Sequence, residues 1–194
     1  MPNNVTNILT VSGDPKRMAE LFEAVKVDEY GPGSLDFAKV IPMPDDIYRG
    51  NLGKAEFAKY GKNNWMDWSI EHWGSKWNSY GYNEYTAKEF DGSSLRFQTA
   101  WSDVHQVIER LAQQYPDLQF SYYWADEDFG NNVGQREYEN GVETECYIPN
   151  CHSREALELA AEIHQIDLED EGYIWNESAN EYEYHPETMG LELN

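Results

Sequence analysis

Two runs of alternating apolar and polar residues constrain the fold of this chain more than any other feature. Residues 95–101 and 118–124 place an apolar or aromatic side chain at nearly every second position. A period of two is typical of a β-strand with one buried face. We therefore expect two half-buried strands, with Trp101 on the inward face of the first and Trp124 on that of the second.

The segment between these strands has the pattern of a helix. Its apolar positions recur at intervals of three and four residues, at Val104, Val107, Ile108 and Leu111. Ser102 is placed to cap this helix by accepting a backbone N–H bond, and Pro116 would end it. The sequence here predicts the order strand, helix, strand.

The first part of the chain predicts the same order. We expect a strand over residues 5–11, then a helix capped by Asp14, and a second strand within residues 35–41. Residues 43–92 have no strand period and are interpreted as an aromatic-rich insertion. The combination βαβ, insertion, βαβ predicts an α+β fold, a ferredoxin-like antiparallel sheet of split βαβ topology.

The C-terminal part is expected to add a hairpin and an acidic helix. Asn140-Gly141 predicts a two-residue turn within a hairpin over about residues 132–148, which would place Arg136 opposite Glu145. A helix should follow from Ser153 to about residue 167, and then a short hairpin of residues 173–175 and 182–184. We therefore expect a ferredoxin-like domain over residues 1–150, with the helix and tail of residues 151–194 packed on it.

The charge of the chain is strongly negative and unevenly distributed. The formal charge is -22, which excludes a general nucleic-acid or anionic-membrane binder. Residues 126–194 hold 19 acidic and two basic residues, a net charge of -17, whereas the first 125 residues carry -5. Solubility alone would explain an acidic surface, but the asymmetry also indicates an acidic interaction face.

The last predicted helix and the turn after it supply the candidate residues of that face. Acidic residues follow one stripe of the helix and continue beyond it. They are Glu155, Glu158, Glu162, Glu169, Asp170 and Glu171. The aromatic and aliphatic residues of the same region can bury a face, so we expect the acidic segment to fold rather than remain disordered.

Four segments together resemble a known family. They are residues 2–10, 37–44, 73–78 and 99–102, which include the sequences Phe37-Ala38-Lys39-Val40-Ile41-Pro42-Met43-Pro44 and Trp73-Gly74-Ser75-Lys76-Trp77-Asn78. Over about residues 1–150 the chain resembles the YubB ferredoxin-like family, uncharacterised proteins carried by plasmids and prophages. The resemblance implies a ferredoxin-like core with an aromatic insertion. It assigns no catalytic residue.

The insertion concentrates aromatic residues, with four tryptophans followed by Tyr80, Tyr82 and Tyr85. Aromatic faces stack on sugars, bases or cations, so one interpretation is a ligand platform. Its candidate residues are Trp65, Trp68, His72, Trp73, Lys76, Trp77 and Asn78. The other interpretation is that these rings cover the open face of the sheet.

Motifs for metal binding or catalysis are weak. Cys146 and Cys151 lack the paired spacing of a structural zinc site and are expected to be reduced thiols. Asp126, Asp128 and Glu137 occupy positions 1, 3 and 12 of an EF-hand-like loop without its glycine, which indicates a loose cation site at most. No motif of a nucleotide-binding or hydrolytic enzyme is present, so we expect no cofactor and no enzymatic activity.

The leading hypothesis is a non-enzymatic interaction protein of a mobile genetic element. It would bind a basic surface of a host protein, such as a nucleic-acid-handling or defence protein, through the acidic residues. We expect it in the cytoplasm, because the mean hydropathy is -0.78 and neither a signal segment nor a membrane span is evident. The alternatives are a small-ligand-binding domain that uses the aromatic insertion, and a purely structural accessory protein.

Overall fold

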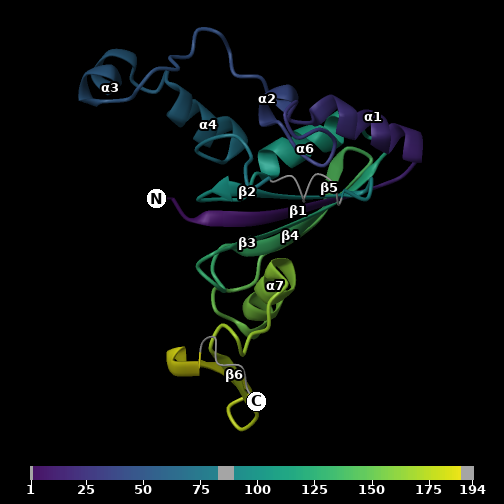
Figure 1. The fold of residues 1–194 in the computed structure, drawn as a ribbon, viewed down its shortest axis with the longest axis vertical. Helices are drawn as coiled ribbons and strands as arrows, with labels where there is room; N and C mark the ends of the chain where they lie inside the picture. Colours follow the sequence, from purple (N-terminus) through teal and green to yellow (C-terminus); the bar gives the residue numbers. More distant parts are fainter. Residues whose placement is uncertain (1, 83–89, 189–194) are drawn as a thin grey trace.

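A five-stranded antiparallel sheet forms the centre of the molecule, with helices on both faces (Figure 1). The structure, a computed structural model, describes residues 2–82 and 90–188. The sheet strands are β1 (Asn4–Ser12), β2 (Ser94–Ala100), β3 (Gln119–Asp126), β4 (Val133–Glu139) and β5 (Val142–Tyr147). The helices are α1 (Pro15–Val25), α2 (Phe37–Val40), α3 (Lys54–Tyr60), α4 (Trp65–Trp73), α6 (His105–Gln114) and α7 (Arg154–His164). A separate hairpin, β6 (Tyr173–Asn176) and β7 (Glu181–Tyr184), follows α7, and a short 3-10 helix, Pro186–Thr188, follows the hairpin.

The strand order β2-β1-β3-β4-β5 contains the expected split βαβ unit. Strand β1 pairs antiparallel with both β2 and β3, so these two strands run parallel with β1 between them. Helix α6 connects them across one face. The α+β class and the ferredoxin-like antiparallel sheet predicted from the two alternating runs are therefore confirmed.

The prediction of a strand within residues 35–41 is wrong. Residues 37–40 instead form the short helix α2, whose N-terminus is capped by Asp36, with Oδ1 accepting from the Ala38 N–H at 3.0 Å. The spacing of three between Phe37 and Val40 buries both side chains on one side of this helix turn. The segment outside the sheet therefore runs from the end of α1 to the start of β2, and is longer than the expected insertion of residues 43–92.

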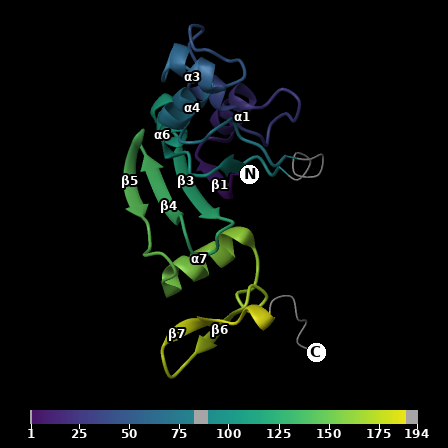
Figure 2. The same ribbon diagram turned by 90° about the vertical axis from the view of Figure 1, so that its left-hand side faces the viewer.

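The alternation of β1 divides the hydrophobic residues between two cores. Val5, Leu9 and Val11 belong to the larger core, on the face covered by α1, α2, α4 and α6. Ile8 points to the opposite face and packs on the smaller core beneath α7, with Ala160 and other residues of that helix. Among the described helices, α7 is the one that packs against the second face of the sheet (Figure 2).

A buried polar network joins strands β2, β1 and β3. The amide of Asn7 donates to the hydroxyl of Thr99 at 2.9 Å, and the Tyr122 hydroxyl donates to Asn7 Oδ1 at 2.6 Å. All three side chains are fully buried. The Tyr122 oxygen also accepts from the Val104 N–H at 2.9 Å, so the network reaches the start of α6. Burial raises the pKa of Tyr122 well above its usual value, and the hydroxyl stays protonated.

The corner between β2 and α6 differs from expectation in two ways. Strand β2 ends at Ala100, and Trp101 is 46% exposed with a φ of 75°, so it does not face the core. Ser102 does not cap the helix. The carboxylate of Asp103 accepts from the His105 N–H at 3.2 Å instead. The side chain of Thr99 donates to the Ser102 carbonyl at 2.6 Å, which turns the chain out of the strand at this point.

The hairpin of β4 and β5 forms as predicted, but with a bulge. Asn140 and Gly141 have φ values of 53° and 77°, as a type I′ turn requires. The register shifts between Glu137 and Tyr138, so Arg136 lies opposite Cys146 rather than Glu145. Its guanidinium pairs with Glu143 instead. Each residue of β5 is exposed, and this strand forms one edge of the sheet.

The predicted C-terminal helix and last hairpin are present, and the helix ends at His164, three residues before the expected end. Ser153 caps α7, and residues 173–176 pair with residues 181–184 in the last hairpin. Within residues 2–82 and 90–188, no helix has the length and apolar character needed to span a bilayer.

The buried network yields a test of stability. Replacing Tyr122 with Phe removes the hydroxyl. The Val104 N–H and the side-chain amide oxygen of Asn7, Oδ1, then lose this hydrogen-bond partner. Unsatisfied buried groups of this kind cost about 1–3 kcal/mol each, so Tyr122→Phe should lower the free energy of unfolding by that order. Urea denaturation measures it. Tyr147→Phe, at an exposed ring, is the control, and equal stability of the two variants would contradict the role of the network.

Candidate functional site

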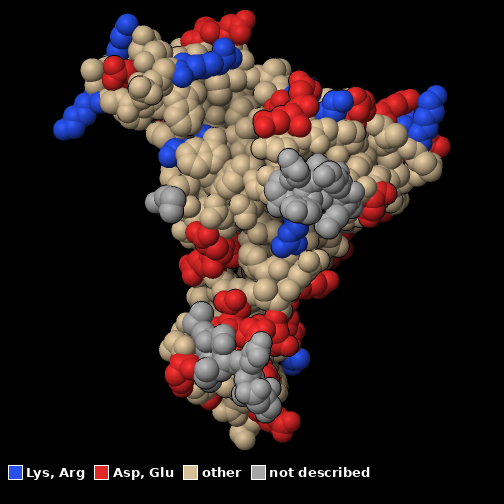
Figure 3. Space-filling view, in the orientation of Figure 1, with Lys and Arg blue, Asp and Glu red and all other residues tan. Residues whose placement is uncertain are grey.

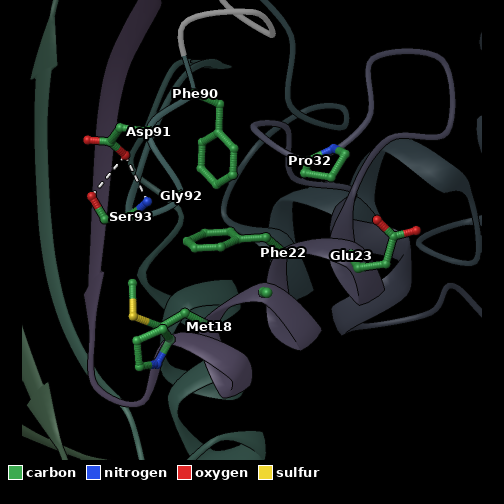
Figure 4. A pocket seen from close by; sticks show the side chains of 10 residues that line it. Met18, Phe22, Glu23, Pro32, Phe90, Asp91, Gly92 and Ser93 are labelled. Atoms are coloured by element: carbon green, nitrogen blue, oxygen red, sulfur yellow. Dashed lines mark hydrogen bonds between the residues drawn. The ribbon is translucent and has the colours of Figure 1, made fainter.

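A pocket of about 520 Å³ lies between α1 and the start of β2 (Figure 4). Its walls are mostly apolar. The rings of Phe22 and Phe90 meet edge to face at 4.8 Å between centroids. The carboxylate of Asp91 is already engaged, because it accepts from the N–H and hydroxyl of Ser93 and from the Ser94 N–H, which lowers its pKa. The pocket therefore has an apolar lining and little chemistry to offer.

The acidic residues of the C-terminal part gather in one region, which we call the acidic module and define as residues 153–188. It contains eleven carboxylates: Glu155, Glu158, Glu162, Asp167, Glu169, Asp170, Glu171, Glu177, Glu181, Glu183 and Glu187. Arg154 is its only Lys or Arg. Figure 3 shows Lys and Arg mainly over the upper part of the molecule, whereas Asp and Glu dominate the lower part, where the module lies.

A shallow pocket of about 340 Å³ opens between α7 and the β6–β7 hairpin. Three carboxylates line it, those of Glu158, Asp167 and Glu169, together with the rings of Trp175 and Tyr182. Carboxylates bind guanidinium and ammonium groups by charge-assisted hydrogen bonds, and aromatic faces attract the same cations. The pocket therefore suits a cationic side chain.

Arg154 shows how such a cation is held within the module. Its guanidinium lies 4.5 Å from the centroid of the Trp175 ring, and its Nε donates to Glu158 Oε1 at 2.7 Å. Tyr182 lies on the same carboxylate, with its hydroxyl 3.5 Å from Oε1. One wall of the pocket thus already combines an aromatic ring and a carboxylate around a guanidinium.

The expected acidic residues divide between this pocket and the outer surface. Glu158 and Glu169 line the pocket. Glu155 and Glu162 are exposed on α7, and the pKa of Glu155 is lowered by its own backbone N–H and by the Ser153 hydroxyl. Asp170 and Glu171 lie in the turn that follows α7, outside the pocket lining.

Sequence reasoning missed Asp167, Trp175 and Tyr182 as members of this pocket. The alternation of the last hairpin was a usable signal, since Trp175 and Tyr182 are cross-strand partners with ring centroids 5.0 Å apart.

An aromatic cleft lies at the opposite end of the molecule, between the loop before α3 and helix α4. Two adjoining pockets of about 400 and 430 Å³ form it, and both are lined by Arg49, Trp65 and Trp77. Trp65 is held in place by a hydrogen bond from its Nε1 to the Gly50 carbonyl at 3.1 Å. Arg49 donates to the Met43 carbonyl at 2.9 Å, which fixes the loop across the cleft.

Lys76 lies beside this cleft between two exposed tryptophans. Its Nζ is 4.6 Å from the ring centroid of Trp77 and 5.1 Å from that of Trp101. Trp77 is 37% exposed and Trp101 is 46% exposed, both high for so large an apolar side chain. Lys76 also lines the larger of the two pockets. The ammonium group thus extends the cleft from Trp77 to Trp101.

The other expected platform residues have structural contacts. Trp68 and Trp73 belong to the larger core, and Trp73 Nε1 donates to the Ile41 carbonyl at 2.9 Å. Asn78 uses its amide on Asp36 and on the Phe37 backbone. His72 is exposed and packs on Trp68. Each interpretation of the aromatic insertion therefore applies to part of it. Trp68 and Trp73 cover the sheet, whereas Trp65, Lys76 and Trp77 lie at the surface and could form a platform. Tyr85 lies outside the described residues.

The loose cation site is not assembled. Asp126 accepts from the amides of Asn3 and Asn132, whereas Glu137 accepts from the Ser121 hydroxyl at 2.6 Å. In the part of the chain that the structure describes, no three His, Cys, Asp or Glu side chains are arranged to hold a metal ion. Cys146 and Cys151 are free and exposed.

The fold and the comparison with known families agree on the class of domain. The sheet with its split βαβ unit defines a ferredoxin-like domain. Residues 81–167 match a family model described as a ferredoxin-like domain in Api92-like protein. The match spans β2 to α7, less than half of the chain, and leaves out Trp65, Lys76 and the β6–β7 hairpin. No curated protein and no solved structure matches the chain.

Arg154 provides a test of how the hairpin is held on α7. Arg154→Gln removes the cation that bridges Glu158 and Trp175, so the hairpin should open more often. Hydrogen exchange of the amides in residues 173–176 should become faster, while exchange in β3 stays unchanged. Arg110→Gln, on an exposed part of α6, is the control. Unchanged exchange in the hairpin would show that the cation does not hold it.

Proposed function

We propose that the protein is a non-enzymatic interaction protein that binds a basic surface of a partner protein through the acidic module. The observation that carries this proposal is the pocket of Glu158, Asp167 and Glu169 beside Trp175 and Tyr182. An arginine or lysine side chain of the partner would enter this pocket. The exposed carboxylates around it would attract the rest of a basic surface and speed the encounter.

The surroundings of the pocket support this role. Within the described residues of the module, Glu158 pairs with an arginine, whereas neither Asp167 nor Glu169 forms an ion pair with a basic residue. Ten of the eleven carboxylates are exposed, so their ionised forms remain solvated in the free protein. The cost of bringing a cation to them is correspondingly small.

The setting in which the protein works is part of the same proposal. The resemblance to YubB-like proteins supports an origin on a plasmid or prophage, and a host protein as the partner. Nucleic-acid-handling or defence proteins are partners of suitable chemistry, because surfaces that bind nucleic acid are basic. Such a partner implies action in the cytoplasm.

A defined basic peptide tests the electrostatic mechanism. A decaarginine peptide should bind the wild-type protein, and the affinity should fall steeply between about 0.05 and 0.5 M salt, because the Debye length shortens over this range. The double variant Asp167→Asn, Glu169→Gln should weaken binding about tenfold at low salt, since each pocket carboxylate contributes a charge-assisted hydrogen bond. Calorimetric titration measures both effects.

A matched pair of exposed carboxylates on α1 separates the pocket from overall charge. Glu20→Gln, Glu23→Gln removes the same two charges at the other end of the molecule and should change the affinity less than twofold. If the two double variants lose affinity equally, net charge alone explains the binding and the pocket has no specific role. Binding that does not respond to salt would refute the electrostatic mechanism.

A further inference from the structure

Trp101 combines strain with exposure, and the surrounding structure enforces both. A φ of 75° is rare for a bulky residue and costs about 1–3 kcal/mol. The Trp101 N–H donates to the Asn3 carbonyl at 3.0 Å, and its own carbonyl accepts from the Asn132 amide at 3.3 Å. The buried network holds the neighbouring residues Thr99 and Val104. A strained backbone that holds an aromatic ring out of the core points to a function of that ring.

The ring of Trp101 lies beside the ammonium group of Lys76, which a second ring, that of Trp77, also contacts. Lys76 Nζ lies between the rings of Trp77 and Trp101, and no carboxylate within the described residues forms an ion pair with it. Arg49 lines the same pocket, with its guanidinium 50% exposed and 3.8 Å from the carboxylate of Asp45. The cleft therefore presents the unpaired ammonium of Lys76, the partly neutralised guanidinium of Arg49, the half-buried ring of Trp65 and the exposed rings of Trp77 and Trp101.

These groups select a ligand with a flat ring and a negative charge. Tryptophan faces stack on aromatic rings, with nucleobases among the best partners, and lysine and arginine bind phosphate oxygens. Each of the two pockets, at about 400 and 430 Å³, lies within the range of small-molecule sites. A mononucleotide carries both chemistries in one molecule of this size.

Local charge allows such a ligand to approach an acidic protein, and total charge limits its length. Residues 45–67, which include Arg49 and Trp65 of the cleft, hold four Lys or Arg and four Asp or Glu, a net charge of zero within a chain of -22. A small anion experiences mainly this locally neutral field and the ammonium of Lys76, because other charges are screened beyond about 10 Å. A polynucleotide would extend past this neutral region toward acidic surface and be repelled.

We infer that the cleft lined by Arg49, Trp65, Lys76 and Trp77, with Trp101 beyond Lys76 at its edge, binds a mononucleotide, with its base stacked on the tryptophans and its phosphate on Lys76 and Arg49. This site is independent of the acidic module and lies at the other end of the molecule.

Two substitutions test the inference by calorimetric titration with AMP, GMP, CMP and UMP at up to millimolar concentration. Trp101→Gly removes one stacking face and should weaken binding about fivefold or more. Glycine adopts a positive φ without strain, so the same variant should keep or raise the melting temperature. Lys76→Gln removes the cation between the rings and should weaken binding by a similar factor.

Matched variants and simpler probes decide between outcomes. Lys16→Gln and Tyr147→Ala remove an exposed lysine and an exposed ring elsewhere, and both should bind as the wild type does. The inference is overturned if no mononucleotide binds the wild-type protein, or if both cleft variants retain full affinity. If inorganic phosphate binds as tightly as the mononucleotides, the tryptophan rings do not contribute to binding and the inference is overturned. If a short oligothymidylate binds more tightly than UMP, the inference of a mononucleotide ligand is wrong and the ligand is a single-stranded nucleic acid.

Discussion

The hydrogen bonds among Asn7, Thr99 and Tyr122 are the constraint on which the rest of the structure depends. Buried polar groups are costly unless each has a partner, so strands β2, β1 and β3 are stable only in the register that joins them. The same bonds extend to Ser102 and Val104 and determine where β2 ends and α6 begins. The outward position of Trp101 follows from this corner, so the core of the domain and the edge of the aromatic cleft are parts of one arrangement.

Charge separates the molecule into two ends with different chemistry. The segment around α3 and α4, residues 45–76, has equal numbers of acidic and basic residues and is rich in aromatic rings, whereas the acidic module holds eleven carboxylates and one arginine. The sheet lies between them, so each end keeps its own electrostatic environment at physiological salt. This separation explains how a strongly acidic chain can carry a cleft suited to a small anion.

Secondary-structure elements whose sequence pattern has a single physical cause could be predicted from the sequence. The alternation in residues 95–100 and 119–124, the turn at Asn140 and the cap at Ser153 all gave the observed elements. Predictions failed where a local hydrogen bond competed with the pattern, as at Asp36, or where distant residues decided the outcome, as at Trp101. The two pockets depend on such distant contacts. Trp65 and Lys76 could be proposed from the cluster of aromatic residues in the insertion, but the contact of Lys76 with Trp101 required the fold.

The two borders of the sheet are treated differently. Backbone bonds between Tyr80 and Gln98 cover the outer side of β2, whereas β5 leaves its outer side unpaired within the described sheet. Bare strand borders tend to recruit further copies of a chain into growing aggregates. Glu143 and Glu145 are both exposed on β5. Glu143 is paired with Arg136, so the carboxylate of Glu145 is the charge that a second molecule aligned on this border would bring close to its own copy. Mutual repulsion thus keeps the molecules apart as they become more crowded, without a covering segment on that side.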